Sequence, residues 1–322
     1  MIVSTETPQP TPALPPRRPR YRRLRILFTL AMIGIVTPWL SRGLVQVPTL
    51  GWLTDLGSHW QWLCVPAAMF TGIFAWRGLA RLAALLVLGA GLYGLWAVMP
   101  PLAIKASDGD APTLRVVTAN VLYTNADPGG LIEWALSQRA DVILLQEVGR
   151  DFAAELEAQH TRFTHRHLAP RDDPFGVGVI SRHPLRDAAV IDGPGGIPMV
   201  QANVETPDGT VPIVVAHPFP PLTESAHRDR AETLRQLDAR AARTPMLVVG
   251  GDFNATPWSS AFSDVKHLGI ASRGLPTWRE VLPIDHVLVG TGWALKMADR
   301  GPSGGSDHRP LVVELVRVRP AR

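Results

Sequence analysis

Five acidic or amide side chains stand beside short apolar runs, where a buried strand can hold a side chain rigidly next to a ligand. Asp252 and Asn254 follow such a run in LVVGGDFNATPW, Asn120 follows one in VVTANVLY, and Glu147 follows one in ADVILLQEVG. Asp307 precedes the apolar run of GSDHRPLVVEL. Carboxylate oxygens are hard ligands for cations such as Mg²⁺. An amide can hold a water or a phosphoryl oxygen without adding negative charge.

The GDFN stretch by itself allows two interpretations. If the extended backbone continues, Asp252 and Asn254 face the same way, because side chains in a strand repeat every second residue. The alternative is a strand that ends in an Asx turn. Gly250 and Gly251 precede this pair. We expect them to turn the chain tightly and to leave room for a ligand beside the backbone.

Further groups able to do chemistry stand in comparable places. His217 ends an apolar run in VVAHPFPP, Asp285 opens IDHVLV, and His308 follows in SDHRP. In isolation, His217 would be an ordinary histidine of a proline-rich loop. Trp278 is either a core residue or a wall of a substrate pocket. Arg228, near the start of a predicted helix, is a candidate contact to phosphate.

The elements that must position these groups follow from hydrophobic periodicity. Strands are expected at 114–118, 142–145, 176–181, 211–215, from 247 through the glycines, from 284, and at 311–318. Helices are expected at 131–137, 151–159, 224–243 and 262–268. The polar groups therefore gather at strand ends, as is typical of sites in α/β proteins.

Together these segments resemble the endonuclease/exonuclease/phosphatase superfamily of metal-dependent phosphoesterases. The resemblance covers roughly residues 113–318, with six motifs in the family's order. It implies a two-sheet α/β sandwich flanked by helices. It also implies a Mg²⁺ or Mn²⁺ site, one ion or two, built from Glu147 and Asp307, with Asn120 ordering the ligands.

The same resemblance implies roles for the remaining groups. His308 would pair with Asp285 and act on the scissile phosphate, either as a cation or as a base toward water. Asp252, which is also a candidate cation ligand, and Asn254 would position the attacking water. His217 would hold a nonbridging phosphoryl oxygen.

The first hundred residues have a different character. Residues 1–23 are rich in proline and arginine, and we expect a disordered cytoplasmic tail. Three apolar segments follow at about 24–40, 60–76 and 82–104, each near the roughly 20 residues that cross a bilayer as a helix. The alternative is a buried helical hairpin in a soluble domain. A linker at 105–112 leads to the catalytic domain, 113–322. This arrangement resembles the membrane-anchored, YafD-like branch of the superfamily.

The distribution of charge predicts an orientation. Six arginines precede residue 26, and Arg77 and Arg81 lie between the second and third segments. Positive residues favour the cytoplasmic side. Three crossings then make a multi-pass protein of the cell (inner) membrane, with its catalytic domain outside the cytoplasm. The one cysteine, Cys64, lies in the second segment, so that domain forms no disulfide.

The basic character belongs to the N-terminal part. Residues 106–322 carry 22 basic and 26 acidic side chains. A mildly acidic domain argues against a nonspecific nuclease, whose affinity rests on many basic contacts to phosphates. We expect a membrane-anchored phosphodiesterase or phosphomonoesterase that acts on small molecules or lipid headgroups, with membrane lipids as neighbours. The alternatives are an extracytoplasmic DNA nuclease and a non-catalytic membrane protein that keeps the fold for binding.

Overall fold

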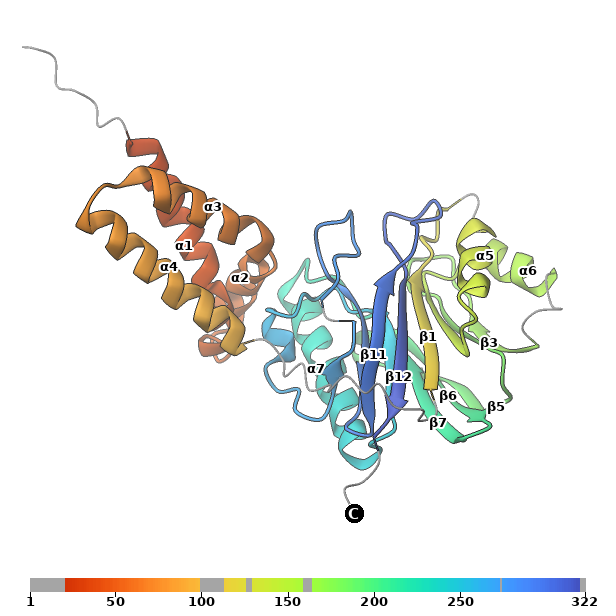
Figure 1. Ribbon diagram of the computed structural model, residues 1–322. Coiled ribbons are helices and arrows are strands. Elements are labelled where there is room, and N and C mark those ends of the chain that lie inside the picture. The colour runs from red at the N-terminus through yellow and green to blue at the C-terminus, as the bar shows by residue number, and fades with distance from the viewer. Residues whose placement is uncertain (1–20, 99–112, 126–128, 159–163, 273, 319–322) are drawn as a thin grey trace, which may run out of the picture.

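A computed structural model describes residues 21–98, 113–125, 129–158, 164–272 and 274–318 of the protein. A bundle of helices made by residues 21–98 lies at one end of a two-sheet sandwich made by the rest (Figure 1). Two helices of the bundle contact the sandwich: α2 contacts α7, and α1 contacts the 3-10 turn near residue 260. The predicted tail lies outside the described residues except for its last three, of which Arg22 and Arg23 already belong to the first helix. The predicted linker also lies outside them.

Each sheet has six strands. The first has the order β11-β12-β1-β2-β4-β3, with bounds Trp293–Arg300, Leu311–Arg317, Thr113–Asn120, Val142–Gln146, Val177–Ser181 and His165–Ala169. The second has the order β5-β6-β7-β8-β10-β9, with bounds Leu185–Asp192, Pro198–Thr206, Gly209–Val215, Val248–Asp252, Asp285–Val289 and Gly269–Ile270. One parallel pair lies inside each sheet, β1 with β2 and β7 with β8.

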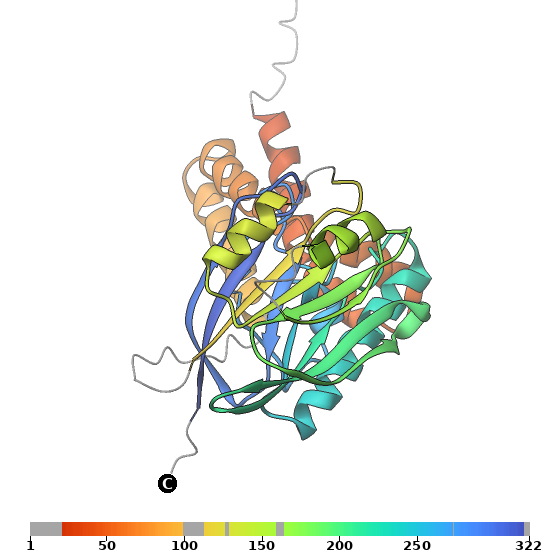
Figure 2. The ribbon, with the colours of Figure 1, turned by 90° about the vertical axis from the view of Figure 1, so that its right-hand side faces the viewer.

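The central strands, such as β2, β4, β8 and β10, are buried on both faces, which explains their continuous apolar runs. Alternate residues of both sheets, such as Leu144 and Ile213, form one core between the sheets. The outer face of the first sheet packs against α5 (Gly129–Ser137) and α6 (Arg150–Ala158), and that of the second packs against α7 (Glu224–Arg243) (Figure 2). The predicted sandwich flanked by helices is confirmed.

Two local predictions were wrong. Residues 262–268 form no α-helix. Only a 3-10 turn occurs at Ser260–Phe262, because the Asp238 carboxylate accepts bonds from the backbone N–H groups of residues 266–268. Gly250 and Gly251 make room for protein and not for a ligand. A Cβ at Gly250 would meet the Leu144 side chain of the opposite sheet, and one at Gly251 would collide with the Ala216 carbonyl.

The N-terminal bundle has four helices, α1 (Arg22–Gly43), α2 (Pro48–Ser58), α3 (Gln61–Ala75) and α4 (Leu79–Val98). Helix α1 and residues 79–96 of α4 are long and apolar enough to cross a membrane, which is weak evidence by itself. Helix α3 has 15 residues and is shorter than a usual span. Three full-length spans are therefore not confirmed. The unexpected helix α2 starts at Pro48, a residue suited to the first helical turn.

Candidate active site

The candidate residues meet because the two parallel strand pairs end at the same edge of the sandwich. Asn120 is the last residue of β1 and Glu147 follows β2, both in the first sheet. In the second sheet, His217 follows β7 and Asp252 ends β8. Asp285 opens the antiparallel strand β10 directly opposite Asp252. Side chains from both sheets therefore face one space.

That space is a cavity of about 650 Å³. Seven of the predicted residues line it: Glu147, His217, Asp252, Asn254, Trp278, Asp307 and His308. Asn120 and Asp285 lie directly behind them and hold them by hydrogen bonds. Arg228 does not join this group, because its side chain is exposed and pairs with Glu224 on its own helix.

Asn120 links the two sheets. Its amide nitrogen donates to Glu147 Oε1 at 2.8 Å and to Asp252 Oδ2 at 3.2 Å. Its amide oxygen accepts from the backbone of Leu122. The second oxygen of Glu147 accepts from the Tyr123 N–H at 3.1 Å. Asn120 thus orders the Glu147 carboxylate from behind, and Glu147 keeps lone pairs directed at the cavity.

Glu147 also has an unusual backbone. Its φ is 59°, in the left-handed region that non-glycine residues seldom adopt. Strain of this kind concentrates at functional sites, where surrounding structure holds the residue in place. Here the bonds from Asn120 and Tyr123 hold the side chain, which is half-buried at the cavity wall.

His308 and Asp285 form a buried pair. His308 Nδ1 donates to Asp285 Oδ2 at 2.8 Å, and Nε2 lies 3.7 Å from Asp252 Oδ2. Burial by itself lowers the pKa of the imidazole, but the two nearby carboxylates outweigh burial and raise the pKa to about 10. His308 is therefore a cation at neutral pH, with Nε2–H directed toward the cavity side of Asp252.

Asp252 also lies beside a second histidine, His217. His217 Nε2 lies 3.5 Å from Asp252 Oδ2, while His217 Nδ1 donates to the Pro174 carbonyl and so fixes the ring. Burial works against charge on Asp252, yet the charge of His308 and the bond from His217 lower its pKa to about 2. Burial likewise opposes charge on His217, and Asp252 reverses that effect and raises the His217 pKa. Asp252 is thus a permanent anion between two imidazoles.

The GDFN stretch adopts the Asx turn. Asp252 Oδ1 accepts from the backbone N–H of Asn254 at 2.8 Å, and Asn254 has a φ of 49°. The extended geometry therefore stops at Asp252, but both side chains still line the cavity. The Asn254 amide nitrogen donates to the Pro218 carbonyl at 3.1 Å, which fixes the orientation of this side chain.

Trp278 lines the cavity and also positions an acid. Its indole Nε1 donates to Asp307 Oδ2 at 2.8 Å, and its backbone pairs with His308. Asp307 Oδ1 lies 3.9 Å from His308 Nε2. Trp278 is therefore a pocket wall, and its hydrogen bond fixes the direction of a candidate ligand.

A comparison of the sequence with family profiles agrees with this arrangement of the site. The profile of the Endonuclease/Exonuclease/phosphatase family matches residues 117–308, more than half of the chain. The chain belongs to this family. Members of the Endonuclease/Exonuclease/phosphatase family are hydrolases of the phosphoesterase and nuclease type. Among curated proteins, no sequence matches the chain significantly.

Solved structures of the Endonuclease/Exonuclease/phosphatase family share the fold. A family member from Beutenbergia cavernae DSM 12333 has 20% identity, a TM-score of 0.53, and coverage of 64% of this chain and 72% of its own. A humanized D. rerio TDP2 has 15% identity and a TM-score of 0.55, with coverage of 63% and 98%. A family member from Bacteroides vulgatus has 15% identity and a TM-score of 0.52, with coverage of 64% and 100%. At these identities the likeness concerns the fold alone.

Family members generally use a divalent metal, and the residues here fit one. Glu147 and Asp307 are half-buried acids that line the same cavity, each oriented by one or more hydrogen bonds. Mg²⁺ is commonly held by one or two carboxylates and keeps several waters, which suits this sparse pair. Asn120, whose oxygen and nitrogen are both engaged within the protein, orders Glu147 rather than lining the cavity.

A tighter cluster also exists among the described residues. Ligand atoms of Asp252, Asp285 and His308 lie within 4.8 Å of one another. This cluster is less suited to a cation, because His308 Nδ1 is bound to Asp285 and the raised pKa keeps its ring protonated. A protonated imidazole has no lone pair for a metal. The cluster is better explained as a buried charge network.

Residues of the N-terminal bundle complete the cavity, and sequence reasoning missed them. Leu56, His59 and Trp60, at the end of α2 and the start of α3, line the cavity with the catalytic candidates. His59 Nδ1 accepts from the Thr256 backbone N–H. Nothing in the sequence marked these bundle residues as part of a site. No local pattern links them to residues some 200 positions away.

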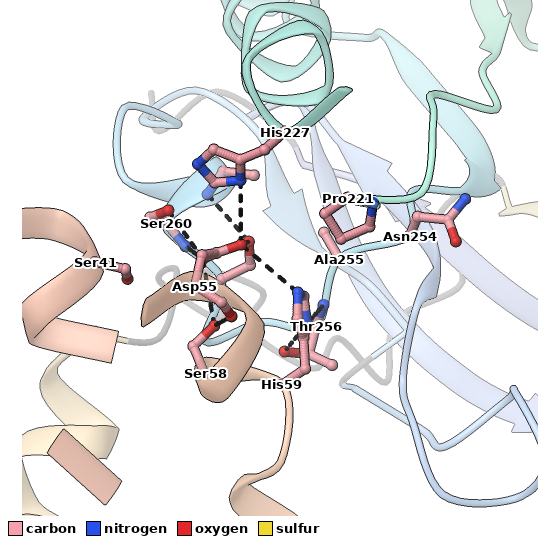
Figure 3. Close-up of polar contacts among 12 residues, drawn as sticks. Ser41, Asp55, Ser58, His59, Pro221, His227, Asn254, Ala255, Thr256 and Ser260 are labelled. Carbon is pink, nitrogen blue, oxygen red and sulfur yellow. Dashed lines mark hydrogen bonds and ion pairs between the residues drawn. The ribbon is translucent and has the colours of Figure 1, made fainter. Parts of the chain in front are cut away.

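Asp55 holds the two parts together (Figure 3). Its side chain is 0% exposed and lies 2.7 Å from Nη2 of Arg230, which is also 0% exposed. The Ser260 N–H donates to Asp55 at 2.6 Å, and Ser259 Oγ donates at 3.0 Å. Arg230 in turn donates to the Asn254 carbonyl. The bundle is thereby bonded to the turn that carries Asn254.

Proposed function

We propose that this protein is a membrane-anchored, metal-dependent phosphoesterase that hydrolyses phosphodiester or phosphomonoester bonds. The observation that carries the proposal is the gathering of Glu147, Asp252 and the His308–Asp285 pair around one cavity, at the ends of strands from both sheets. Hydrolysis of a phosphoester needs an oriented water, stabilisation of charge on the phosphoryl oxygens, and help for the leaving oxygen.

Each group has a role that its surroundings support. Cationic His308, held by Asp285, faces developing negative charge on the phosphoryl group. Asp252 and Asn254 orient the water whose oxygen attacks phosphorus while the bond to the leaving oxygen breaks. His217 contacts a nonbridging oxygen. Glu147 and Asp307 would hold Mg²⁺ or Mn²⁺, which when bound supplies Lewis-acid stabilisation of that charge.

Membrane anchoring is part of the proposal. Large apolar side chains are exposed along α1, α3 and α4, among them Leu30, Phe70, Leu86 and Trp96. Exposed apolar surface of this extent is typical of contact with lipid. The helices alternate in direction, so that α1 ends and α3 begins near the sandwich, and α4 runs back toward it (Figure 1).

That alternation supports three crossings, with α3 as a short span. The arginine-rich N-terminus then lies in the cytoplasm and the sandwich on the other side of the cell (inner) membrane. We propose the same division as the sequence indicates, with a basic tail at 1–23, a membrane region at 24–104, a linker at 105–112 and a catalytic domain at 113–322. This organisation is that of the YafD-like branch of the family.

The test uses the full chain purified in detergent with an aryl phosphodiester and an aryl phosphomonoester. We expect hydrolysis with Mg²⁺ or Mn²⁺ and loss of activity with EDTA. His308→Ala should abolish the activity. His183→Ala is a matched control, because His183 also pairs with an aspartate, Asp141 at 3.0 Å, but lies outside the cavity. Equal activity of His308→Ala and the unaltered protein would refute the assignment.

The nuclease alternative is tested in the same preparation with plasmid DNA. A D. rerio TDP2 complexed with a single-strand DNA product shares this fold at 14% identity and a TM-score of 0.54. The cavity here has no lysine or arginine among its lining residues in the described part of the chain. We therefore expect plasmid to be cut more slowly than a small ester. Absence of any hydrolysis would favour a non-catalytic binding module.

A further inference from the structure

The cavity has a polar floor and an apolar wall, and part of the wall comes from outside the catalytic fold. The floor is formed by the acids and histidines described above. The wall is formed by Leu56 and Trp60 of the N-terminal bundle and by Pro221 and Leu222 of the sandwich. An apolar wall beside a phosphate site favours a substrate that carries an apolar part next to its phosphoester group.

We propose that this wall is a binding subsite for the hydrocarbon chain of an amphiphilic phosphoester. The inference rests on the proposed function, because the phosphoester group would occupy the floor while the chain lies along Leu56, Trp60 and Leu222. The substrate class is therefore a phosphorylated lipid rather than a soluble metabolite or a nucleic acid.

Exposure of the wall supports this occupant. Leu222 is 77% exposed and Trp60 is 46% exposed. Both lie at the cavity, so an apolar ligand would remove their surface from water. Burial of apolar area is worth about 25 cal/mol per Å². In a phospholipid-like molecule, contact with such a surface would stabilise the binding of the hydrocarbon chain, whereas it would not stabilise the binding of the phosphate.

The wall is also fixed in place. The Trp52 indole of α2 donates to the Pro221 carbonyl at 2.9 Å, which ties the bundle to the loop that carries Leu222. Asp55 and Arg230 form their buried ion pair just beside it. Figure 3 shows α2 ending next to Pro221 and the Asn254–Thr256 turn. Since the ion pair is buried and the Trp52 bond is part-buried, the bundle side of the wall is a permanent part of the cavity.

The wall is continuous with the surface proposed to face lipid. Trp60 directly precedes α3, whose side chains Leu63, Phe70 and Phe74 are exposed. A hydrocarbon chain can therefore pass from the outer surface of the bundle to Trp60 along apolar groups. No lysine or arginine lines the cavity in the described residues to favour a polyanion.

The experiment compares two esters with the same reacting group, methyl 4-nitrophenyl phosphate and dodecyl 4-nitrophenyl phosphate. The full chain in detergent is assayed with Mg²⁺, and the measured quantity is the ratio of kcat/KM, dodecyl over methyl. We expect a ratio of at least about ten, since one apolar side chain's worth of burial is about a tenfold effect. Partition of the dodecyl ester into micelles is the same for every variant.

Trp60→Ser and Leu222→Ser should each lower this ratio several-fold. Val190→Ser is the matched control, because Val190 is an exposed apolar residue on β5 outside the cavity. Its ratio should stay at the level of the unaltered protein. Two wall variants on separate parts of the chain guard against misfolding of one.

Four results would overturn the inference. His308-dependent hydrolysis of both esters with a ratio near one would refute the subsite and leave the proposed function standing. An unchanged ratio in both wall variants would do the same. Faster cleavage of single-stranded DNA that is lost in Trp60→Ser would assign the wall to base stacking. Absence of hydrolysis of either ester would refute the proposed function and the inference together.

Discussion

Removal of the Asp55 carboxylate should strongly destabilise the contact between the bundle and the sandwich. Asp55→Ala leaves the Arg230 guanidinium, 0% exposed, without its 2.7 Å partner. Breaking a buried ion pair by removing one partner costs about 3–5 kcal/mol, because the remaining charge is buried and uncompensated. Two further donors, Ser260 N and Ser259 Oγ, lose their acceptor as well, so we expect the upper half of that range.

The assay is thermal unfolding of the full chain in detergent, combined with hydrogen exchange at residues 254–260 and at the start of α7. Asp55→Ala should increase exchange in both segments. Thr49→Ala is the control, because Thr49 bonds to Glu224 across the same contact but is exposed, and such a bond contributes under about 1 kcal/mol. The double variant Asp55→Leu/Arg230→Met should recover much of the loss, since no charge remains buried. Equal effects of Asp55→Ala and Thr49→Ala would refute the reasoning.

Four more predictions follow from the same geometry. Burial by itself raises the pKa of Asp55, but bonds from His227 and His59 and the charge of Arg230 outweigh it and hold that pKa well below its usual range. The stabilisation by Asp55 is therefore present above the ordinary carboxyl pKa of about 3.9 and is lost as pH falls further. The amide protection factors across the contact, which correct for the pH dependence of intrinsic exchange, should stay constant from pH 7 to pH 5; a fall in protection in that window would contradict it. Glu147→Gln keeps the shape but removes the anionic oxygen, so the Mg²⁺ concentration for half-maximal activity should rise by about tenfold or more in a metal titration. Trp278→Phe removes the bond to Asp307 Oδ2 and should raise the same concentration by a smaller factor, with kcat at saturating Mg²⁺ nearly restored. A reporter active only outside the cytoplasm, fused after residue 322, should give a signal, and a cytoplasmic reporter at the same place should give none.

The strands and their polar ends could be predicted from the sequence for a physical reason. Strands buried on both faces leave continuous apolar runs, and the site residues stand where those runs stop. Glu147 and Asp252 could therefore be placed at strand ends without knowledge of the sheet order. The meeting of Asp285 with His308 was implied by the family resemblance, and the 2.8 Å bond agrees with it.

Other features depend on long-range contacts that leave no local pattern. Residues 262–268 have apolar spacing suited to a helix, but three of their N–H groups bond to Asp238 on α7. Gly250 appeared to make room for a ligand, whereas Leu144 of the opposite sheet occupies that room. Helix α2 has no counterpart among the predicted elements, because one acid and several polar residues interrupt its apolar pattern. That acid, Asp55, is the residue that the sandwich buries.

The burial of Arg230 has a consequence for how the enzyme can be handled. Arg230 has no exposed side-chain surface, and its ion-pair partner Asp55 belongs to α2 of the bundle. A soluble fragment that begins near residue 113 would expose this arginine, which bonds to the Asn254 carbonyl, to solvent. It would also lack Leu56, His59 and Trp60 from the cavity. Such a fragment is a poor surrogate for kinetics, crystallisation or inhibitor screening, and the bundle should be retained wherever the catalytic half is produced.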